Sequence, residues 1–120
     1  MSIKTWKKEF FSGLSKAVKS RRAAIAHSLR KWTGLLPANL KKHHVRQPEM
    51  SAYIDDEDFN VFDVDGASCA LCYKYDLNGC IKCPLYQTLT HRCDECDGPY
   101  THWCDTGDPR PMIKALKKCK

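Results

Sequence analysis

Residues 69–96 read CALCYKYDLNGCIKCPLYQTLTHRCDEC, and this stretch decides what kind of fold the chain can form. It holds three pairs of cysteines, each separated by two residues: Cys69 and Cys72, Cys80 and Cys83, and Cys93 and Cys96. Two intervening residues let both sulfur atoms of a pair turn toward one point, and two such pairs supply the four thiolates of a tetrahedral zinc site. The spacing therefore predicts that these cysteines bind metal.

The way in which the pairs combine is left open by the spacing. The predicted zinc ligands are Cys69, Cys72, Cys80, Cys83, Cys93, Cys96 and Cys104. The first two pairs enclose only seven residues, whereas combining the first pair with the third leaves twenty between them, close to the usual zinc-ribbon spacing. The second pair would then share a site with Cys104 and one further donor, for which the candidates are His102, His91 and Cys119. We expect one or two zinc ions.

Disulfides and an iron–sulfur cluster are the alternative uses of these cysteines. Disulfides need an oxidising compartment, but no apolar run of signal-peptide length follows the basic N-terminus. We therefore expect a reducing cytoplasm, where paired cysteines more often bind metal. No stretch approaches the roughly 20 apolar residues of a membrane span, so no membrane partner is expected. The spacings match neither common ferredoxin run, which disfavours an iron–sulfur cluster.

The N-terminal third of the chain has the pattern of amphipathic helix. Its apolar residues recur at three- and four-residue steps: Ile3, Trp6, Phe10, Leu14, Val18, Ile25, Leu29 and Trp32. Ser2 is a suitable N-cap and Gly34 marks the expected end, with a break near Ser20 because one helix would be long. A clean stripe also makes self-association reasonable. A second short helix is predicted over residues 37–43, with Pro37 in its first turn.

Charge is divided unevenly along the chain. Residues 1–50 contain twelve Lys or Arg and two acidic residues, a net charge of +10, whereas residues 51–120 contain eight and twelve, a net charge of −4. A basic segment of this kind is suited to binding polyanions. The residues predicted to bind nucleic acid or another partner are Lys4, Lys8, Lys16, Lys19, Arg22, Arg30 and Lys31.

The remainder of the chain predicts little regular structure. Residues 59–64 favour a short strand, closed by a turn at residues 65–66, and residues 109–119 favour a short basic helix. Larger aliphatic residues are few after Pro48, so we expect metal to replace a missing hydrophobic core. The predicted fold class is α with a small zinc-knuckle region: N-terminal helices, an irregular metal-stapled C-terminal half and little β structure. The predicted divisions are a basic helical region, an acidic linker and a zinc-binding region, at residues 1–47, 48–66 and 67–120.

Several of these motifs resemble a known group of proteins. The motifs are Cys69-Ala70-Leu71-Cys72-x-x-Tyr75, Cys80-x-x-Cys83-Pro84-Leu85, Cys93, Pro99-Tyr100, Ser28-Leu29-x-Lys31-Trp32-x-Gly34-Leu35 and Asn39-Leu40-Lys41-Lys42-His43. Over residues 23–100 the chain resembles small cysteine-rich zinc-binding proteins encoded by tailed bacteriophages and prophages. Cys96 and Cys104 depart from that group's pattern. The resemblance implies a phage origin and the cytoplasm of the infected bacterial host, but no reaction.

Two binding functions follow as hypotheses. The first is a non-enzymatic accessory protein that binds nucleic acid through the basic helical face. The alternative is an inhibitor or adaptor that binds a host defence or nucleic-acid-processing protein, because small phage proteins often act in this way. The acidic segment of residues 55–65, with Tyr53, Phe59 and Phe62 among or beside its carboxylates, would supply that surface.

An enzyme is the least favoured hypothesis. A zinc-containing nuclease would need a histidine to activate water, and the candidates are His43, His44, His91 and His102. The seven- and nine-residue gaps between the cysteine pairs are too short to hold a catalytic hairpin and helix. Ligation by cysteine alone is typical of a closed structural site, whereas catalytic zinc keeps an open position.

Overall fold

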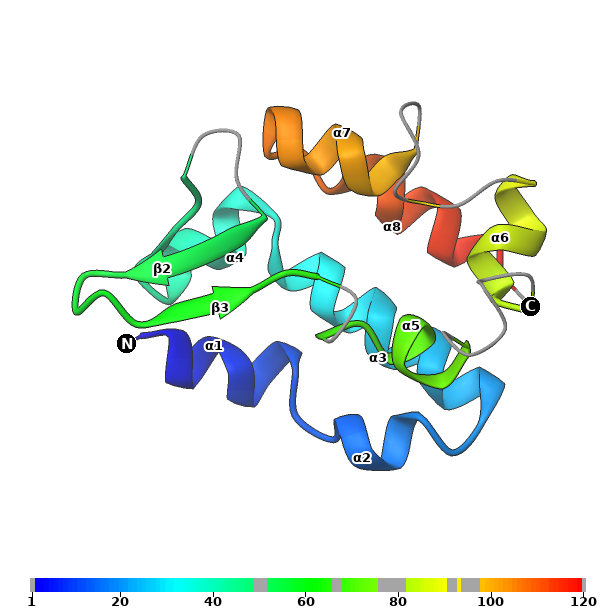
Figure 1. Cartoon of the computed structure of the whole chain (residues 1–120). Coiled ribbons are helices and arrows are strands. Elements are labelled where there is room, and N and C mark those ends of the chain that lie inside the picture. Colours follow the sequence, from blue (N-terminus) through cyan, green and yellow to red (C-terminus); the bar gives the residue numbers. More distant parts are fainter. Residues whose placement is uncertain are drawn as a thin grey trace.

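The fold is built around one central helix, α3 (Arg21–Gly34). The computed structural model describes residues 2–48, 52–65, 68–75, 82–90, 93 and 98–119. The other elements are α1 (Ile3–Phe10), α2 (Leu14–Ala17), α4 (Pro37–Lys42), β1 (Val45–Arg46), β2 (Tyr53–Asp56), β3 (Val61–Asp63), α5 (Ala70–Tyr75), α6 (Pro84–Leu89), α7 (Pro99–Thr106) and α8 (Arg110–Lys117). In Figure 1, α1 and α2 lie along one side of α3, and α7 and α8 along the other.

The first helix begins where the sequence predicts and packs its apolar face inward. Ser2 caps α1 by accepting a hydrogen bond from the Lys4 backbone N–H at 3.2 Å, and its own N–H donates to Thr5 Oγ1 at 2.9 Å. The residues of its apolar stripe are buried, including Trp6, which is fully inaccessible. Trp6 Nε1 donates to the Gly34 carbonyl oxygen at 2.8 Å, which ties α1 to the end of α3.

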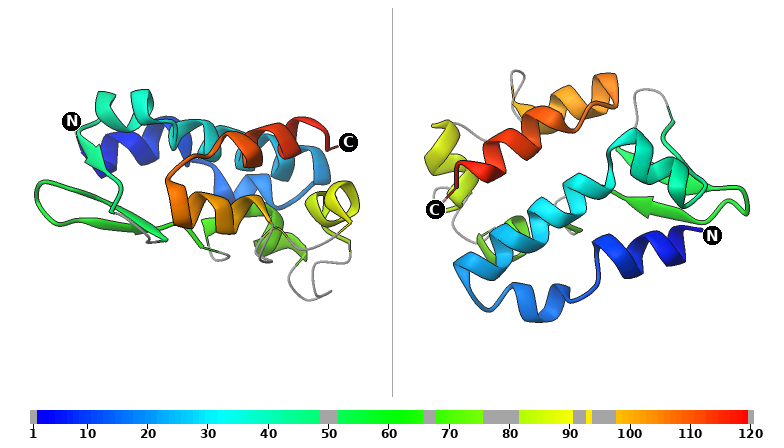
Figure 2. Two further views of the ribbon diagram at one scale, coloured as in Figure 1. Left: turned by 90° about the horizontal axis from the view of Figure 1, so that it is seen from above. Right: turned by 180° about the vertical axis from the view of Figure 1, so that it is seen from behind.

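The predicted long helix is divided twice. The expected break near Ser20 is confirmed, since Ser20 caps α3 by accepting from the Ala23 N–H at 3.1 Å. An earlier break lies at Gly13, whose φ of 88° is a left-handed conformation that glycine adopts without steric cost. The two turns let α1 and α2 fold back along α3, as Figure 2 shows from behind.

The end of α3 is set by close packing against α1. A Cβ atom on Gly34 would lie 2.4 Å from Phe10 Cγ, so only glycine permits this approach. The predicted helix end at Gly34 is therefore confirmed, although the reason is contact with Phe10 and not a left-handed cap. Trp32, the last residue of the apolar stripe, is buried and makes an edge contact with Trp103 at a ring-centroid distance of 5.5 Å.

Three short strands form a small antiparallel sheet in the order β1-β2-β3. Ile54 on β2 pairs with Phe62 on β3, and both side chains face the core. The strand predicted for residues 59–64 is shorter than expected and covers Val61–Asp63. The turn predicted at residues 65–66 lies partly outside the described residues. The hairpin turn precedes β3, and the buried Asp56 carboxylate organises it. Asp56 accepts from the backbone N–H groups of Asp58 and Asn60 at 3.0 and 3.1 Å. Strand β1 lies in the division predicted to be a basic helical region, so that division also contributes to the sheet.

The C-terminal half has more regular structure than the sequence predicts. Helices α5 to α8 occupy most of its described residues, so the expectation of an irregular half is wrong there. The expectation of a missing core is also wrong: the buried residues of this half include Leu71, Leu85, Trp103, Met112 and Leu116. Each short helix has too few apolar residues for a core of its own, but α5 and α8 pack on α3. Segments from all three predicted divisions thus share one hydrophobic cluster.

No helix within the described ranges combines the length and the apolar character needed to cross a membrane.

Candidate metal centre

Six of the eight cysteines fall within the described residues. Cys69 and Cys83 are buried, whereas Cys72, Cys93, Cys104 and Cys119 are partly exposed. The other predicted ligands, Cys80 and Cys96, lie outside the described residues, as does His91.

The first predicted pair, Cys69 and Cys72, is close in space. Cys69 directly precedes α5, its carbonyl oxygen accepts from the Tyr73 N–H at 2.8 Å, and Cys72 lies in the first turn. The two thiols form a hydrogen bond, which is the main cause of a Cys69 pKa well below its ordinary value. Burial opposes this shift, and the charge of Lys31 and a 3.8 Å contact between Ser28 Oγ and Cys69 Sγ favour it. The C-x2-C spacing therefore brings the two thiols of this pair together.

Lys31 does not lie on the predicted basic surface. It is 1% exposed, and its Nζ donates to Ser68 Oγ at 2.9 Å and lies 5.5 Å from the centroid of the Trp32 ring. Burial lowers the pKa of Lys31. The predicted role of Lys31 in partner binding is therefore contradicted, because helix α3 turns this residue toward α5 and away from solvent.

The buried Lys31 ammonium faces the cysteines. Four groups raise its pKa through their charges, against the effect of burial: Cys69, Cys72, Asp65 and Cys93. The Ser68 hydroxyl that Lys31 binds is held in turn by Asp65, since it accepts from the Asp65 N–H and donates to the Asp65 carbonyl oxygen, both at 3.1 Å. Ser68 directly precedes Cys69, so the hydrogen bond from Lys31 ties α3 to the start of the first cysteine pair.

Tyr100 links two more cysteines to this region. Its backbone N–H donates to the Cys93 carbonyl oxygen at 2.9 Å, and its hydroxyl donates to the Val64 carbonyl oxygen at 2.7 Å. Burial, followed by the neighbouring Cys104, raises the pKa of Tyr100 above its ordinary value. Burial also raises the pKa of Cys104. Cys104 on α7 therefore lies beside the same tyrosine that contacts the Cys93 backbone.

Cys83 and Cys119 are placed at α6. Cys83 is the residue before α6, and Pro84 lies in the first turn of that helix, which the sequence analysis did not predict. Cys119 follows α8, where its thiol accepts from Thr88 Oγ1 at 3.6 Å and donates to the Ala115 carbonyl oxygen at 3.5 Å. A role for Cys119 in a second site stays a prediction.

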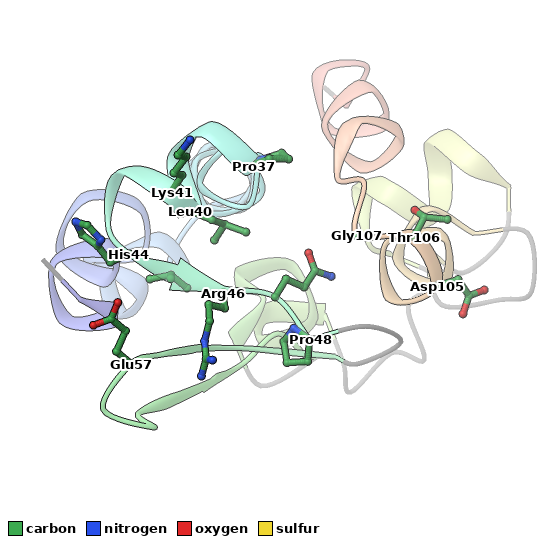
Figure 3. Close-up of a pocket in the computed structure, with 12 residues that line it drawn as sticks. Pro37, Leu40, Lys41, His44, Arg46, Pro48, Glu57, Asp105, Thr106 and Gly107 are labelled. Atoms are coloured by element: carbon green, nitrogen blue, oxygen red, sulfur yellow. The ribbon is translucent and has the colours of Figure 1, made fainter.

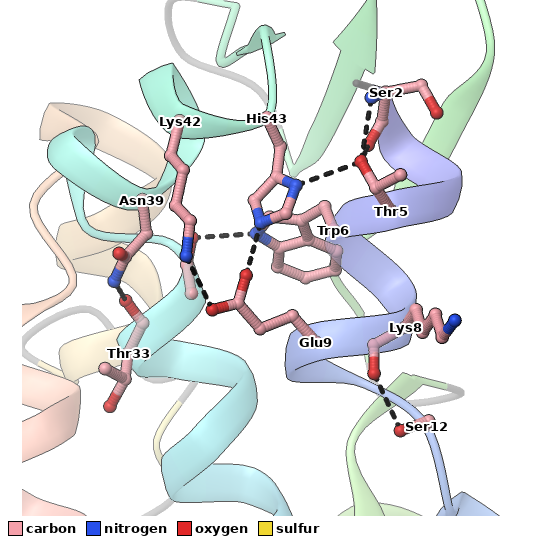
Figure 4. Close-up of polar contacts among 11 residues, drawn as sticks. Ser2, Thr5, Trp6, Lys8, Glu9, Ser12, Thr33, Asn39, Lys42 and His43 are labelled. Atoms are coloured by element: carbon pink, nitrogen blue, oxygen red, sulfur yellow. Dashed lines mark hydrogen bonds and ion pairs between the residues drawn. The ribbon is translucent and has the colours of Figure 1, made fainter.

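The histidines proposed as donors or as a nuclease base have other surroundings. His43 is buried, with Nε2 at 2.5 Å from Glu9 Oε2 and Nδ1 at 2.9 Å from Thr5 Oγ1, so both ring nitrogens serve the packing of α1 against α4 (Figure 4). His102 is exposed on α7, and its Nε2 lies 3.9 Å from Asp108 Oδ2. A role of either histidine beside the cysteines stays a prediction.

The described residues do not by themselves complete a ligand set. Within ranges 2–48, 52–65, 68–75, 82–90, 93 and 98–119, no three His, Cys, Asp or Glu side chains are grouped so that they could hold one metal ion. What this part of the chain supplies is a close thiol pair, with a buried cation bound to the residue before it. The donor chemistry fits zinc, because thiolates are its preferred ligands in structural sites.

The predicted basic surface is exposed apart from Lys31. Six of its seven residues reach solvent: Lys4 and Lys8 on α1, Lys16 on α2, Lys19 after it, and Arg22 and Arg30 on α3. Glu9 is the only acidic residue in range 2–48. Hydrogen bonds from Lys42 and then His43 hold the Glu9 pKa below its ordinary value, so its charge is already paired. The outer side of these helices is therefore almost purely positive.

A pocket of about 580 Å³ lies between the α4–β1 segment and the end of α7 (Figure 3). Its lining mixes cationic residues, Lys41 and Arg46, with the carboxylates of Glu57 and Asp105. Gln47 spans it, with Nε2 3.5 Å from the Trp103 carbonyl oxygen. This mixed lining presents no set of groups suited to a particular reaction.

Sequence reasoning missed the buried cation and the two serines beside it. Ala24, Ser28 and Lys31 follow one another at helical spacing on α3, and all three are buried. Two small residues three and seven positions before a lysine were the available signal that this face packs closely against another element.

Comparisons with known proteins identify no relative. No protein-family model, no curated protein and no solved structure matches the chain.

Proposed function

We propose that the protein is a zinc-stabilised, non-enzymatic accessory protein that binds nucleic acid through the outer side of α1, α2 and α3. The observation that carries the proposal is the exposure of six predicted basic residues on helices whose apolar residues face the core. The one carboxylate among these helices is paired with Lys42 and His43. Such a surface suits the binding of phosphates, because no unpaired carboxylate of these helices competes for its basic side chains.

Zinc is proposed as a structural component. The close Cys69–Cys72 pair supports this, as does the contact of Ser28 Oγ with Cys69 Sγ at 3.8 Å. Zinc bound only by thiolates contributes folding free energy and leaves no open position for substrate. The resemblance to phage proteins suggests the cytoplasm of an infected bacterium as the setting.

A binding titration with matched charge changes tests the nucleic-acid proposal. Lys16→Glu with Arg22→Glu reverses two charges on the proposed surface, whereas Lys114→Glu with Lys117→Glu reverses two exposed charges on α8. Both variants have the same net charge. Anisotropy of a short labelled duplex, and of the corresponding single strand, is measured at several salt concentrations.

We expect the first variant to bind at least about tenfold more weakly at low salt, with a salt slope reduced by about two units, one for each lost phosphate contact. The α8 variant should bind nearly as the wild type does. Equal losses in both variants would indicate an effect of net charge alone, and no binding by the wild type at low salt would remove the proposal.

A second candidate is supported by the tip of the β2–β3 hairpin. Phe59 is 79% exposed and has a φ of 63°, a conformation that is unusual for an aromatic residue. The turn that carries it is fixed by Asp56, which is 3% exposed. The carboxylates of Glu57 and Asp58 lie beside Phe59 in the chain. The expected partner is therefore a protein with an apolar pocket for Phe59 and basic residues around that pocket. A rigid exposed aromatic residue is a common anchor of protein interfaces.

Comparative affinity purification tests this candidate. A host protein retained by the wild type should be lost with Phe59→Ser and kept with Tyr73→Ser, which removes another exposed aromatic residue, on α5. The retained protein is then purified and its binding measured directly. If no host protein depends on Phe59, the adaptor function is excluded.

A further inference from the structure

The outer side of α1, α2 and α3 presents a ligand with one kind of long side chain. Every exposed residue of range 2–34 whose side chain is longer than that of serine is a lysine or an arginine, except Glu9. Glu9 already pairs with Lys42 Nζ at 2.9 Å. A ligand of this surface therefore meets seven cationic side chains: Lys4, Lys7, Lys8, Lys16, Lys19, Arg22 and Arg30.

The aromatic side chains of the same helices face the interior. Trp6, Phe10 and Trp32 are buried, and the half-buried Phe11 packs its ring against that of Phe62 at a centroid distance of 4.9 Å. Proteins that bind single-stranded nucleic acid hold the bases by stacking them on exposed aromatic rings. The exposed aromatic residues within the described ranges belong to other elements: Tyr53 on β2, Phe59 in the β2–β3 turn and Tyr73 on α5.

Two of the three arginines on α3 are held by other parts of the protein. Arg30 Nη2 donates to the Ser12 carbonyl oxygen, and Arg21 Nη2 donates to Gln87 Oε1 at 2.9 Å. Arginine reads a base pair by directing two guanidinium N–H groups at the edge of guanine. A guanidinium that already binds the protein has fewer groups free for this, so the surface suits phosphates better than base edges.

The length of the surface matches a short piece of double helix. Helix α3 has 14 residues and is about 21 Å long, and α1 and α2 lie along it (Figures 1 and 2). A DNA duplex carries one negative charge for about every 1.7 Å of its axis and completes a turn in about 34 Å. One turn of duplex therefore spans the surface with the phosphates of both strands, whereas a single strand offers about half that charge density.

We infer that the ligand of this surface is the phosphate backbone of a double helix, bound without preference for base sequence, and not a single strand. An interface built from charge gains affinity by releasing counterions, and a duplex releases more of them per contact than a single strand does. The inference rests on the proposed nucleic-acid binding and names the class of nucleic acid. Duplex DNA and duplex RNA share this backbone chemistry, and the experiment separates them.

The test is a competition experiment on the full chain at low salt. A labelled DNA duplex of about one turn is displaced by unlabelled competitors of the same length: an A·T-rich DNA duplex, a G·C-rich DNA duplex, an RNA duplex and a DNA single strand. We expect the two DNA duplexes to compete within about fivefold of each other, and the single strand to compete more than about fivefold more weakly than either. The strength of the RNA duplex relative to the DNA duplexes identifies which double helix the surface prefers.

A single-residue variant tests the mode of contact. Lys8→Gln removes one exposed charge from α1, and Lys117→Gln removes one from α8 as the control. We expect Lys8→Gln to weaken binding to both DNA duplexes by the same factor and to lower the salt slope by about 0.9 unit, as loss of one phosphate contact does. The control should bind as the wild type does.

The inference and the proposed function fail in different ways. A single strand that competes within about fivefold of the duplexes, or a larger difference between the two DNA sequences, would overturn the inference and leave nucleic-acid binding intact. A loss in Lys8→Gln that depends on base sequence would overturn it as well. If no nucleic acid binds the wild type at low salt, the proposed function itself is overturned.

Discussion

Asp56 and Lys31 are both buried charged residues, but the regions around them satisfy charge in different ways. The Asp56 carboxylate accepts backbone hydrogen bonds from Asp58, Asn60 and, across the fold, Ile3. Burial would raise the Asp56 pKa, but these bonds outweigh it and hold the pKa below its ordinary value. The Lys31 ammonium has one neutral hydroxyl instead.

This difference separates a region that is complete in itself from one that the proposed zinc would complete. Around Asp56, the chain folds its own N–H groups onto the charge, and the hairpin and the start of α1 are fixed together. Around Lys31, the chain supplies one hydroxyl, which belongs to the residue before Cys69. Metal removal should therefore affect the two regions unequally.

Loss of the proposed zinc site should have the largest effect. We expect Cys69→Ser to lose zinc and to give insoluble or protease-sensitive protein, because metal-binding free energy in such sites, about 10 kcal/mol for structural zinc, is folding free energy. Limited proteolysis with mapped cleavage sites should find the first cuts in residues 68–106. Cys119→Ser is the control and should remain resistant. A wild-type melting transition that chelator leaves unchanged would contradict this expectation.

Gly34→Ala should have an intermediate effect that does not depend on metal. The added methyl group would meet the Phe10 ring, and overpacking of this kind costs about 1–3 kcal/mol. Urea unfolding with and without chelator should give the same loss in free energy of unfolding. Gly13→Ala is the comparison, since its Cβ meets nothing within 4 Å and only its positive φ is penalised. If Gly34→Ala lowered the free energy of unfolding only in the presence of zinc, the packing of α1 on α3 would depend on metal, and the two regions would not differ as proposed.

Asp56→Asn should have the smallest effect, and that effect should depend on pH. A carboxylate whose folded pKa is depressed stabilises the protein above its unfolded pKa, and this stabilisation is lost as pH falls through the folded pKa. The difference in melting temperature between wild type and variant should therefore be fully present above the ordinary Asp pKa of 3.8 and shrink in acid. The experiment is a series of thermal melts from neutral to acid pH. A difference that is constant with pH would show that the charge of Asp56 is not what matters.

The elements with strong local signals were predicted correctly. Ser2 and Ser20 cap the helices that follow them, Pro37 opens α4, and the C-terminal basic helix forms as α8. Each of these signals acts within a few residues, through one hydrogen bond or one fixed dihedral angle. Burial of Trp6 and Trp32 also follows from their place on the apolar stripe.

The missed features depend on contacts between distant segments. Strand β2 was not predicted, because its pairing with β3 and the turn between them depend on the buried Asp56, which also contacts Ile3. The core of the C-terminal half was missed for a similar reason: Leu71 and Leu116 belong to short helices that are buried only by packing on α3.

From the sequence alone came the cysteine spacing, the division of charge and the starts of α1, α3 and α4, because these are properties of neighbouring residues. Tertiary structure alone decided that Lys31 leaves the basic surface for the interior, since a residue's burial depends on which element covers its helix face. It also placed the Lys31 ammonium on the Ser68 hydroxyl, next to Cys69, a contact between residues 37 positions apart that local patterns do not reveal. Local chemistry names the available groups, and only packing decides which distant groups meet.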